Sequence, residues 1–119
     1  MNRLRAFGPA VRGLGWMVTH EPNTRIHIAA TIAAIALGFW LHVSRDDWFW
    51  LGTAVAVVWI AEAFNTAVEQ LANEITLEHR ERIGRAKDVA AAGVLTAAIG
   101  AMAIGIAVFV PTFRQAIGG

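Results

Sequence analysis

Four polar residues interrupt an otherwise apolar stretch in the middle of the chain, and their types suit acid–base and metal chemistry. They are Glu62, Asn65, Glu69 and Asn73. On a helix with about 100° per residue, they fall within roughly 80° of one another and form one polar stripe. An ionised residue at the centre of a membrane-spanning helix costs roughly 2.5–3.5 kcal/mol, so such a stripe needs a cation, a partner or water. Alternatively, the span ends near Ala63 and the remainder is a solvated extension.

The segment that follows this stripe carries basic residues among acidic ones. Lys87 and Asp88 stand together at the start of the next apolar run. A lysine there can contact a phosphate, and an aspartate can orient the lysine or a metal-bound group; the alternative is snorkelling and helix capping at the interface. The other charged residues of this segment are Glu78, Arg80, Glu81, Arg82 and Arg85.

A third acidic residue of interest is Glu21, which precedes the first apolar run and could meet Glu69 at the same membrane depth. Two or three carboxylates around a Mg²⁺–polyphosphate are a recurrent arrangement, because Mg²⁺ binds few protein oxygens together with substrate phosphates. The sequence contains no P-loop, protein-kinase signature or Rossmann glycine fingerprint. Any nucleotide chemistry must therefore use another architecture.

Composition determines the class of protein that carries these residues. Of 119 residues, 56% are hydrophobic and 16% are charged, and the mean hydropathy is +0.51. An average soluble domain has about 25% charged residues, and a chain of this length has too little interior to hide so much apolar surface. A net charge of +1 gives no bulk attraction to nucleic acid, and the absence of cysteine excludes disulfides and thiolate metal sites. We expect an all-α integral membrane protein, with residues 1–119 forming a single domain.

Three apolar runs are long enough to span a bilayer, which takes about 20 residues. We expect transmembrane helices over residues 26–43, 48–72 and 89–110. No secretory signal is expected, because the first apolar run begins too late and lacks the flanking pattern of a signal peptide.

The first twenty residues are predicted to form an amphipathic helix in the membrane interface. An apolar stripe recurs at spacings of three and four, and three arginines lie outside it. Pro9 and the nearby glycines predict a break or kink in this helix; the alternative is a flexible tail. The stripe consists of Leu4, Phe7, Val11, Leu14 and Val18.

Basic residues predict the orientation in the cytoplasmic (inner) membrane. They gather before the first span and between the second and third spans, whereas the first loop holds a single Arg45 and the C-terminal segment a single Arg114. The positive-inside rule then places the N-terminus and the second loop in the cytoplasm and the C-terminus outside. Aromatic residues are expected to form one outer belt: Phe39, Trp40, Trp48, Phe49, Trp50, Phe109 and Phe113.

These motifs resemble those of the small prokaryotic integral membrane lipid kinases, namely diacylglycerol kinase and its undecaprenol kinase relatives. The most specific part is the segment EAFNTAVE at 62–69, followed by RAKD at 85–88 and a span rich in small residues. The N-terminal half adds Glu21 with Asn23, Arg25 and His27. This half resembles the undecaprenol kinase branch more, since the Gram-negative diacylglycerol kinases have an acidic residue at the place of His27.

The resemblance implies a homotrimer of three-span protomers with active sites shared between neighbours at the cytoplasmic face. It implies an ATP-dependent kinase in which Glu62 is the general base for the hydroxyl of a membrane lipid, either undecaprenol or diacylglycerol. The two carboxylates Glu69 and Glu21 would hold Mg²⁺ on ATP. The residues that would position the nucleotide and its phosphates are Asn65, Glu78, Lys87 and Asp88.

Two positions depart from the family pattern. Asn73 replaces the usual aspartate, which puts metal or nucleotide affinity in doubt, and Pro9 stands near the place of a tyrosine that covers the nucleotide in some members. Two other functions remain open from the residues. A proton-coupled transporter could use the intramembrane glutamates, and a holin-like membrane protein could line an axis with the polar stripe.

Overall fold

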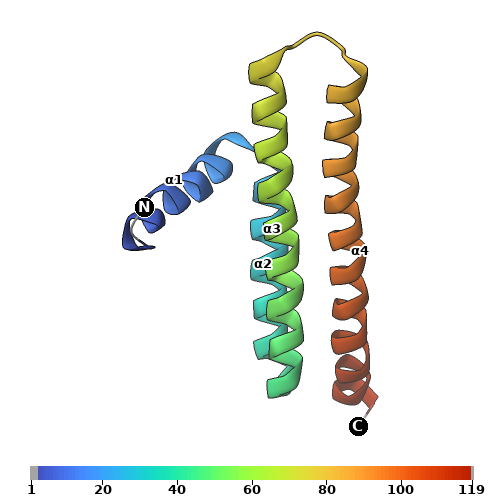
Figure 1. The fold of residues 1–119 in the computed structure, drawn as a ribbon. Helices are drawn as coiled ribbons and strands as arrows, with labels where there is room; N and C mark the ends of the chain where they lie inside the picture. The colour runs from blue at the N-terminus through green and yellow to red at the C-terminus, as the bar shows by residue number, and fades with distance from the viewer. Residues whose placement is uncertain (1–2, 119) are drawn as a thin grey trace.

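The computed structural model describes residues 3–118, which form four helices and, within that range, no strand. Three helices lie side by side as a bundle, while the first leaves the bundle at an angle (Figure 1). The expected all-α class is therefore confirmed. The helices are α1 (Arg3–His20), α2 (Pro22–Leu41), α3 (Arg45–Ile75) and α4 (Glu81–Gly118).

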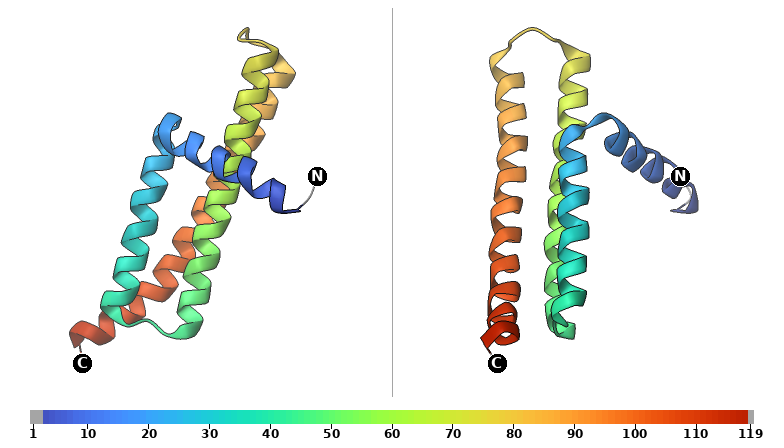
Figure 2. Two further views of the ribbon diagram at one scale, coloured as in Figure 1. Left: turned by 90° about the vertical axis from the view of Figure 1, so that its left-hand side faces the viewer. Right: turned by 180° about the vertical axis from the view of Figure 1, so that it is seen from behind.

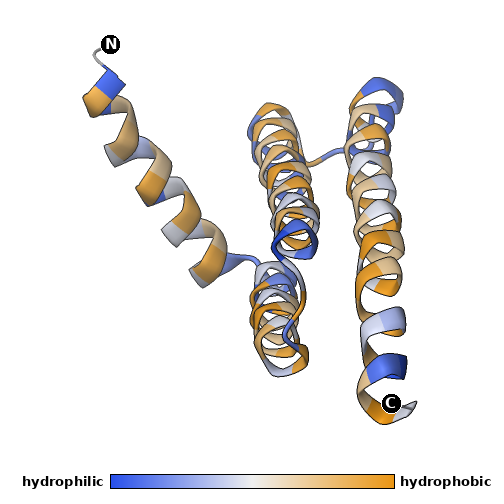
Figure 3. Ribbon diagram, turned by 90° about the horizontal axis from the view of Figure 1, so that it is seen from below, coloured by the Kyte–Doolittle hydropathy of each residue, from blue (hydrophilic) through white to orange (hydrophobic). Residues whose placement is uncertain are grey.

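The three helices of the bundle are each long and apolar enough to cross a membrane, as expected from the three apolar runs. They contain 20, 31 and 38 residues. At 1.5 Å per residue, α2 is about 30 Å long, close to the bilayer hydrocarbon thickness, whereas α3 and α4 reach roughly 46 and 57 Å. Both α3 and α4 therefore continue beyond the apolar runs. In Figure 3 their apolar surfaces extend around much of each helix.

The connection between α2 and α3 is short and capped on both sides. His42 adopts the left-handed conformation, with φ 54° and ψ 50°. The N–H of His42 donates to the Phe39 carbonyl (3.3 Å) and the N–H of Val43 donates to the Gly38 carbonyl (3.2 Å). This is a Schellman motif, so α2 ends before the apolar run does. α3 then begins because the Ser44 hydroxyl accepts from the N–H of Asp47 (3.1 Å).

Trp48 fixes the packing at this end of the bundle. Its indole lies on Gly38 so closely that a Cβ at that glycine would stand 2.5 Å from it. Its ring centroid is 4.9 Å from that of Phe39. Trp48 and Phe109 pack against the buried cluster of Val43, Leu51 and Val108, so these two aromatics of the expected belt serve the core. The exposed members are Phe39, Trp40, Phe49, Trp50 and Phe113.

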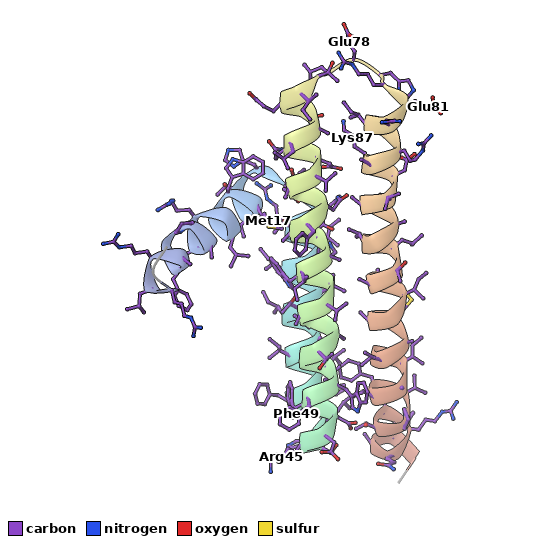
Figure 4. All side chains as sticks on the ribbon, in the orientation of Figure 1. Met17, Arg45, Phe49, Glu78, Glu81 and Lys87 are labelled. Atoms are coloured by element: carbon purple, nitrogen blue, oxygen red, sulfur yellow. The ribbon has the colours of Figure 1, made fainter. Side chains whose placement is uncertain are left out.

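α1 is helical without interruption through Pro9, so the break expected from its glycines and proline does not occur. Pro9 lies in the second turn of α1, where its missing N–H leaves the Arg5 carbonyl without its helical hydrogen bond, yet the helix continues through it. Met17 is buried where α1 crosses α3 (Figures 2 and 4). The predicted apolar stripe of α1 is exposed in the single chain.

Two of the three connections between helices lie toward the same end of the bundle. The α1–α2 joint consists of Glu21 alone, and the α3–α4 connection spans residues 76–80. Both lie toward the same end, and the α3–α4 connection projects further (Figures 1 and 2). The polar stripe of α3 therefore runs past the start of α2 into a part of the bundle where α4 is its main neighbour.

Candidate active site

The carboxylate of Glu62 is buried between α3 and α2. Glu62 is 3% exposed, and its Oε2 lies 3.3 Å from Nε2 of His27, whose side chain is 19% exposed. His27 is one turn into α2, and Glu62 lies in the middle of α3. A buried carboxylate needs a hydrogen-bonding partner, and the imidazole supplies one. Glu62 therefore lies in the protein interior rather than on a solvated extension of α3.

A second polar contact joins the same two helices one turn away. The indole N–H of Trp59 donates to the hydroxyl of Thr31 (3.0 Å), which in turn donates to the His27 carbonyl (2.7 Å). The rings of His27 and Trp59 are 6.5 Å apart between centroids. Two polar contacts in an apolar interface fix the rotation and register of α2 on α3, because a shifted register would leave buried polar groups unpaired.

Asn65 and Glu69 continue along α3 toward the α3–α4 connection. The Oδ1 atom of Asn65 is buried without a hydrogen-bond partner among the described residues. It lines a groove of about 590 Å³ between α3 and α4, together with Phe64, Arg82 and Arg85. Glu69 is half-buried and lies roughly 10 Å beyond Glu62 along the helix axis.

Oxygen donors of this kind suit Mg²⁺, which binds few protein oxygens and completes its shell with phosphate and water. The orphan Oδ1 of Asn65 and the carboxylate of Glu69 are one turn apart on α3. Within residues 3–118, however, no three acidic or histidine side chains come close enough to hold a metal ion. The donor type fits the cation, while one chain supplies only part of a coordination shell.

Lys87 and Asn73 form a contact between α4 and α3. The ammonium of Lys87 donates to Oδ1 of Asn73 at 2.8 Å, in the space between the two helices (Figure 4). An amide oxygen orients the ammonium without neutralising it, whereas a carboxylate would form an ion pair. The departure at Asn73 therefore leaves the positive charge of Lys87 available to an anion.

The remaining predicted residues lie further from the buried pair. Glu78 is exposed in the α3–α4 connection, where its backbone N–H donates to the Thr76 hydroxyl (3.0 Å). Asp88 is exposed on α4. Glu21 is half-buried at the α1–α2 joint, where it is the N-cap of α2 but makes no side-chain cap. Within residues 3–118, neither Glu21 nor Glu78 forms a side-chain hydrogen bond or ion pair with the stripe of α3.

Comparison with known proteins decides the family. The family model for prokaryotic diacylglycerol kinase matches residues 8–109. The chain belongs to the prokaryotic diacylglycerol kinase family.

Relatives in this family carry two kinds of name. The undecaprenol kinase of Bacillus subtilis is 31% identical over 112 residues, which cover 93% of this chain and 91% of the relative. The diacylglycerol kinase of Escherichia coli K12 is 33% identical over 96 residues, covering 81% and 79%. The diacylglycerol kinase of Synechocystis is 32% identical over 111 residues, covering 92% of this chain and 63% of the relative.

Membership in the prokaryotic diacylglycerol kinase family makes this chain a lipid kinase, a phosphotransferase with an alcohol acceptor. The chain is therefore an enzyme, and the two other functions left open by the sequence, a transporter and a holin-like protein, are no longer needed to explain the polar stripe. The buried Glu62 and the oriented Lys87 are the features of the fold that such chemistry can use.

Sequence reasoning missed the partners of the site residues. His27 was noted only as a mark of one branch of the family, yet it contacts Glu62. The replacement of the usual aspartate by Asn73 casts doubt on metal or nucleotide affinity, yet in the structure Asn73 accepts a hydrogen bond from Lys87. The helical spacing does carry a signal for the first contact. His27 and Thr31 share a face of α2, and Trp59 and Glu62 share a face of α3. Two polar pairs can therefore meet across one interface.

Proposed function

We propose that this enzyme transfers the γ-phosphate of Mg²⁺-bound ATP to the hydroxyl of a membrane lipid, undecaprenol or diacylglycerol. The observation that carries this proposal is a carboxylate, Glu62, which is 3% exposed in the middle of a long apolar helix and is held, among the described residues, by His27. A base at that depth suits a hydroxyl that belongs to a lipid rather than to a solute. The relatives named undecaprenol kinase and diacylglycerol kinase give the two acceptor classes.

Glu62 would act as the general base. As the lipid hydroxyl oxygen forms its bond to the γ-phosphorus, the hydroxyl proton passes to the Glu62 carboxylate, and the bond from phosphorus to the bridging oxygen breaks to release ADP. Positioning and electrostatic stabilisation supply most of the acceleration in phosphoryl transfer. Lys87, held by Asn73, would contact the phosphates, with Asn65, Glu78 and Asp88 as further nucleotide ligands.

Glu69 and Glu21 would hold the Mg²⁺, with Glu69 reaching it from α3. When bound, the cation supplies charge neutralisation and orientation of the phosphate oxygens. Glu62 and Glu69 are separated by roughly 10 Å along the helix axis, which leaves room for the transferred group between base and metal.

Apolar hollows beside the His27–Glu62 pair support a lipid acceptor. A groove of about 610 Å³ runs between α1 and the α2–α3 pair, and Leu14 and Val18 of α1 form part of its wall. A smaller hollow of about 280 Å³ includes His27. Both hollows share Thr31 and Trp59, so an alkyl or isoprenoid chain in the groove would have its head close to the buried pair.

The proposed setting is the cytoplasmic membrane, with α1 in the interface and its exposed apolar stripe facing lipid. The α1–α2 and α3–α4 joints would be cytoplasmic and the C-terminus outside, because the basic residues gather near those joints. A homotrimer would complete the metal shell that one chain leaves partial.

Phosphorylation by the purified protein in mixed micelles tests the function. The assay offers [γ-³²P]ATP with undecaprenol and diacylglycerol in competition, with and without Mg²⁺. Labelled lipid that depends on Mg²⁺ is the expected result, and the ratio of products names the acceptor. ATP consumption without labelled lipid would contradict the proposal.

Subunit mixing tests the shared site. Glu62→Gln and Glu21→Ala proteins are each expected to be impaired, and co-reconstitution should restore activity, because the two residues of one site would come from different protomers. Random mixing in a ring predicts about a quarter of wild-type sites. A mixture that never exceeds the sum of its parts, although subunits exchange, would place each site within one chain.

A further inference from the structure

The buried pair of Glu62 and His27 raises the question of what the imidazole does. Nε2 of His27 stands 3.3 Å from Oε2 of Glu62, and the neighbouring Trp59–Thr31 bond of 3.0 Å holds α2 and α3 in the register that this contact needs. Among the described residues, no other side chain forms a hydrogen bond or ion pair with Glu62. His27 is therefore the one side chain within residues 3–118 that can orient the Glu62 carboxylate by a hydrogen bond.

The two oxygens of Glu62 have different surroundings. Oε2 faces His27. Oε1 makes no hydrogen bond within residues 3–118. Oε1 is therefore the oxygen of Glu62 that no neighbouring side chain occupies.

We infer that His27 is a positioning residue for the phosphoryl transfer: its neutral imidazole, protonated on Nε2, donates to Oε2 of Glu62 and leaves Oε1 to receive the lipid proton. The inference rests on the proposed role of Glu62 as the base. A hydrogen bond to a buried carboxylate favours its ionised form, which is the form that a base needs. A neutral donor does so without adding a second buried charge.

The chemistry of the donor suggests a conservative replacement. Nε2 of glutamine is four bonds from Cα, as is Nε2 of histidine, and both can carry a proton toward a carboxylate. Asparagine places its amide one bond closer to the backbone and falls short of Oε2. Phenylalanine keeps a ring of similar size but offers no donor.

Three substitutions of His27 test the inference, with kcat and the KM for Mg²⁺–ATP as readouts. His27→Phe and His27→Asn should lower kcat by about ten- to a hundredfold, the range for losing a hydrogen bond to a charged group. The KM for Mg²⁺–ATP should stay within about twofold, because the nucleotide site lies elsewhere on α3 and α4. His27→Gln should recover most of the kcat.

Gly38→Ala is the control, since its Cβ would press on the Trp48 ring and disturb the packing of α2 on α3 at the other end of the bundle, while the His27–Glu62 pair stays in place. Its kcat should remain near the wild-type value. A loss as large as that of His27→Phe would assign the effect to packing of α2 on α3 and overturn the inference. Wild-type kcat in His27→Phe, or a His27→Gln as slow as His27→Phe, would overturn it as well. If His27→Phe does not fold, the comparison of glutamine with asparagine decides by the same outcomes.

A double-mutant cycle separates this inference from the proposed function. If His27 acts only through Glu62, then His27→Phe should cause no further loss of kcat in a Glu62→Gln background. Additive losses would overturn the positioning role. A Glu62→Gln protein that keeps its kcat would instead refute the proposed base, whatever the His27 variants do.

Discussion

Two polar contacts tie α3 to its neighbours, and they differ in burial and in the charge of the held group. Between α2 and α3, His27 holds Glu62 in a nearly water-free interface. Between α3 and α4, Asn73 holds Lys87 near the exposed end of the bundle. In both contacts a group that can remain uncharged orients a group that the proposed mechanism uses in its charged form. Under the proposed function, the buried contact would orient the base, and the exposed contact would orient a cation that an anionic substrate can still attract.

The largest effect is expected at the charged member of the buried contact. Glu62→Gln should lower kcat by about 10²–10⁴-fold, the usual worth of general-base catalysis, while ATP binding stays nearly intact. Steady-state kinetics together with an equilibrium measurement of nucleotide binding check this. Glu81→Gln, which alters an exposed carboxylate at the start of α4, is the control and should be near wild type. Retention of more than about a tenth of the kcat in Glu62→Gln would refute the base.

Glu69 lies between the two contacts along α3 and is the proposed metal ligand of this helix. Glu69→Ala should raise the Mg²⁺ concentration needed for half-maximal rate by at least about tenfold, since losing even an indirect partner of a metal costs that much. A Mg²⁺ titration of the initial rate measures the change. The control is Glu74→Ala on the exposed surface of the same helix. An unchanged Mg²⁺ dependence in Glu69→Ala would mean that Glu69 does not bind the metal.

The exposed contact should respond more weakly to substitution. Asn73→Asp would turn the bond to Lys87 into a surface ion pair worth about 0–1 kcal/mol. The phosphates then compete with that pair, so the KM for ATP should rise about two- to fivefold at low salt and less at high salt. Asn73→Ala, which removes the partner but adds no charge, is the comparison. A KM that falls in Asn73→Asp would show that the carboxylate serves the metal instead.

The smallest effect on turnover is expected at the far end of the bundle, remote from both contacts. Gly38→Ala would bring a Cβ within 2.5 Å of the Trp48 ring, so the indole must move. Overpacking typically costs about 1–3 kcal/mol. A lower midpoint of thermal unfolding in detergent, with unchanged kcat at low temperature, is the expected result. Gly52→Ala, where a Cβ meets nothing within 4 Å, is the control.

The sequence predicts the bundle well because membrane spans depend on apolar length alone. The all-α class is confirmed, and so is the presence of three helices that are long and apolar enough to cross a membrane. Helix ends were harder, because His42 takes a left-handed conformation that glycine usually occupies. The break expected at Pro9 is absent, since one missing backbone bond does not end a helix.

The site was predictable only along each helix. A stripe on α3 follows from helical periodicity, and that places Glu62, Asn65 and Glu69 relative to one another. Which neighbour each one meets depends on the rotation and register of α2 and α4, and no local pattern determines those. The contacts of Glu62 with His27 and of Asn73 with Lys87 therefore emerged only from the structure. The roles of these residues in metal and nucleotide binding remain predictions.

The short connection at His42–Ser44 has a consequence for how the molecule can move. Its backbone is tied at both helix ends, and Trp48 is seated on Gly38 beside it. A tilt of α2 relative to α3 would therefore displace the two helices least at this connection and most at their other ends, as in a hinge motion. Glu62 is roughly 25 Å from this connection, counted along α3 from Arg45. A slight tilt between the helices would open the buried pair to an entering chain while the other end stays closed.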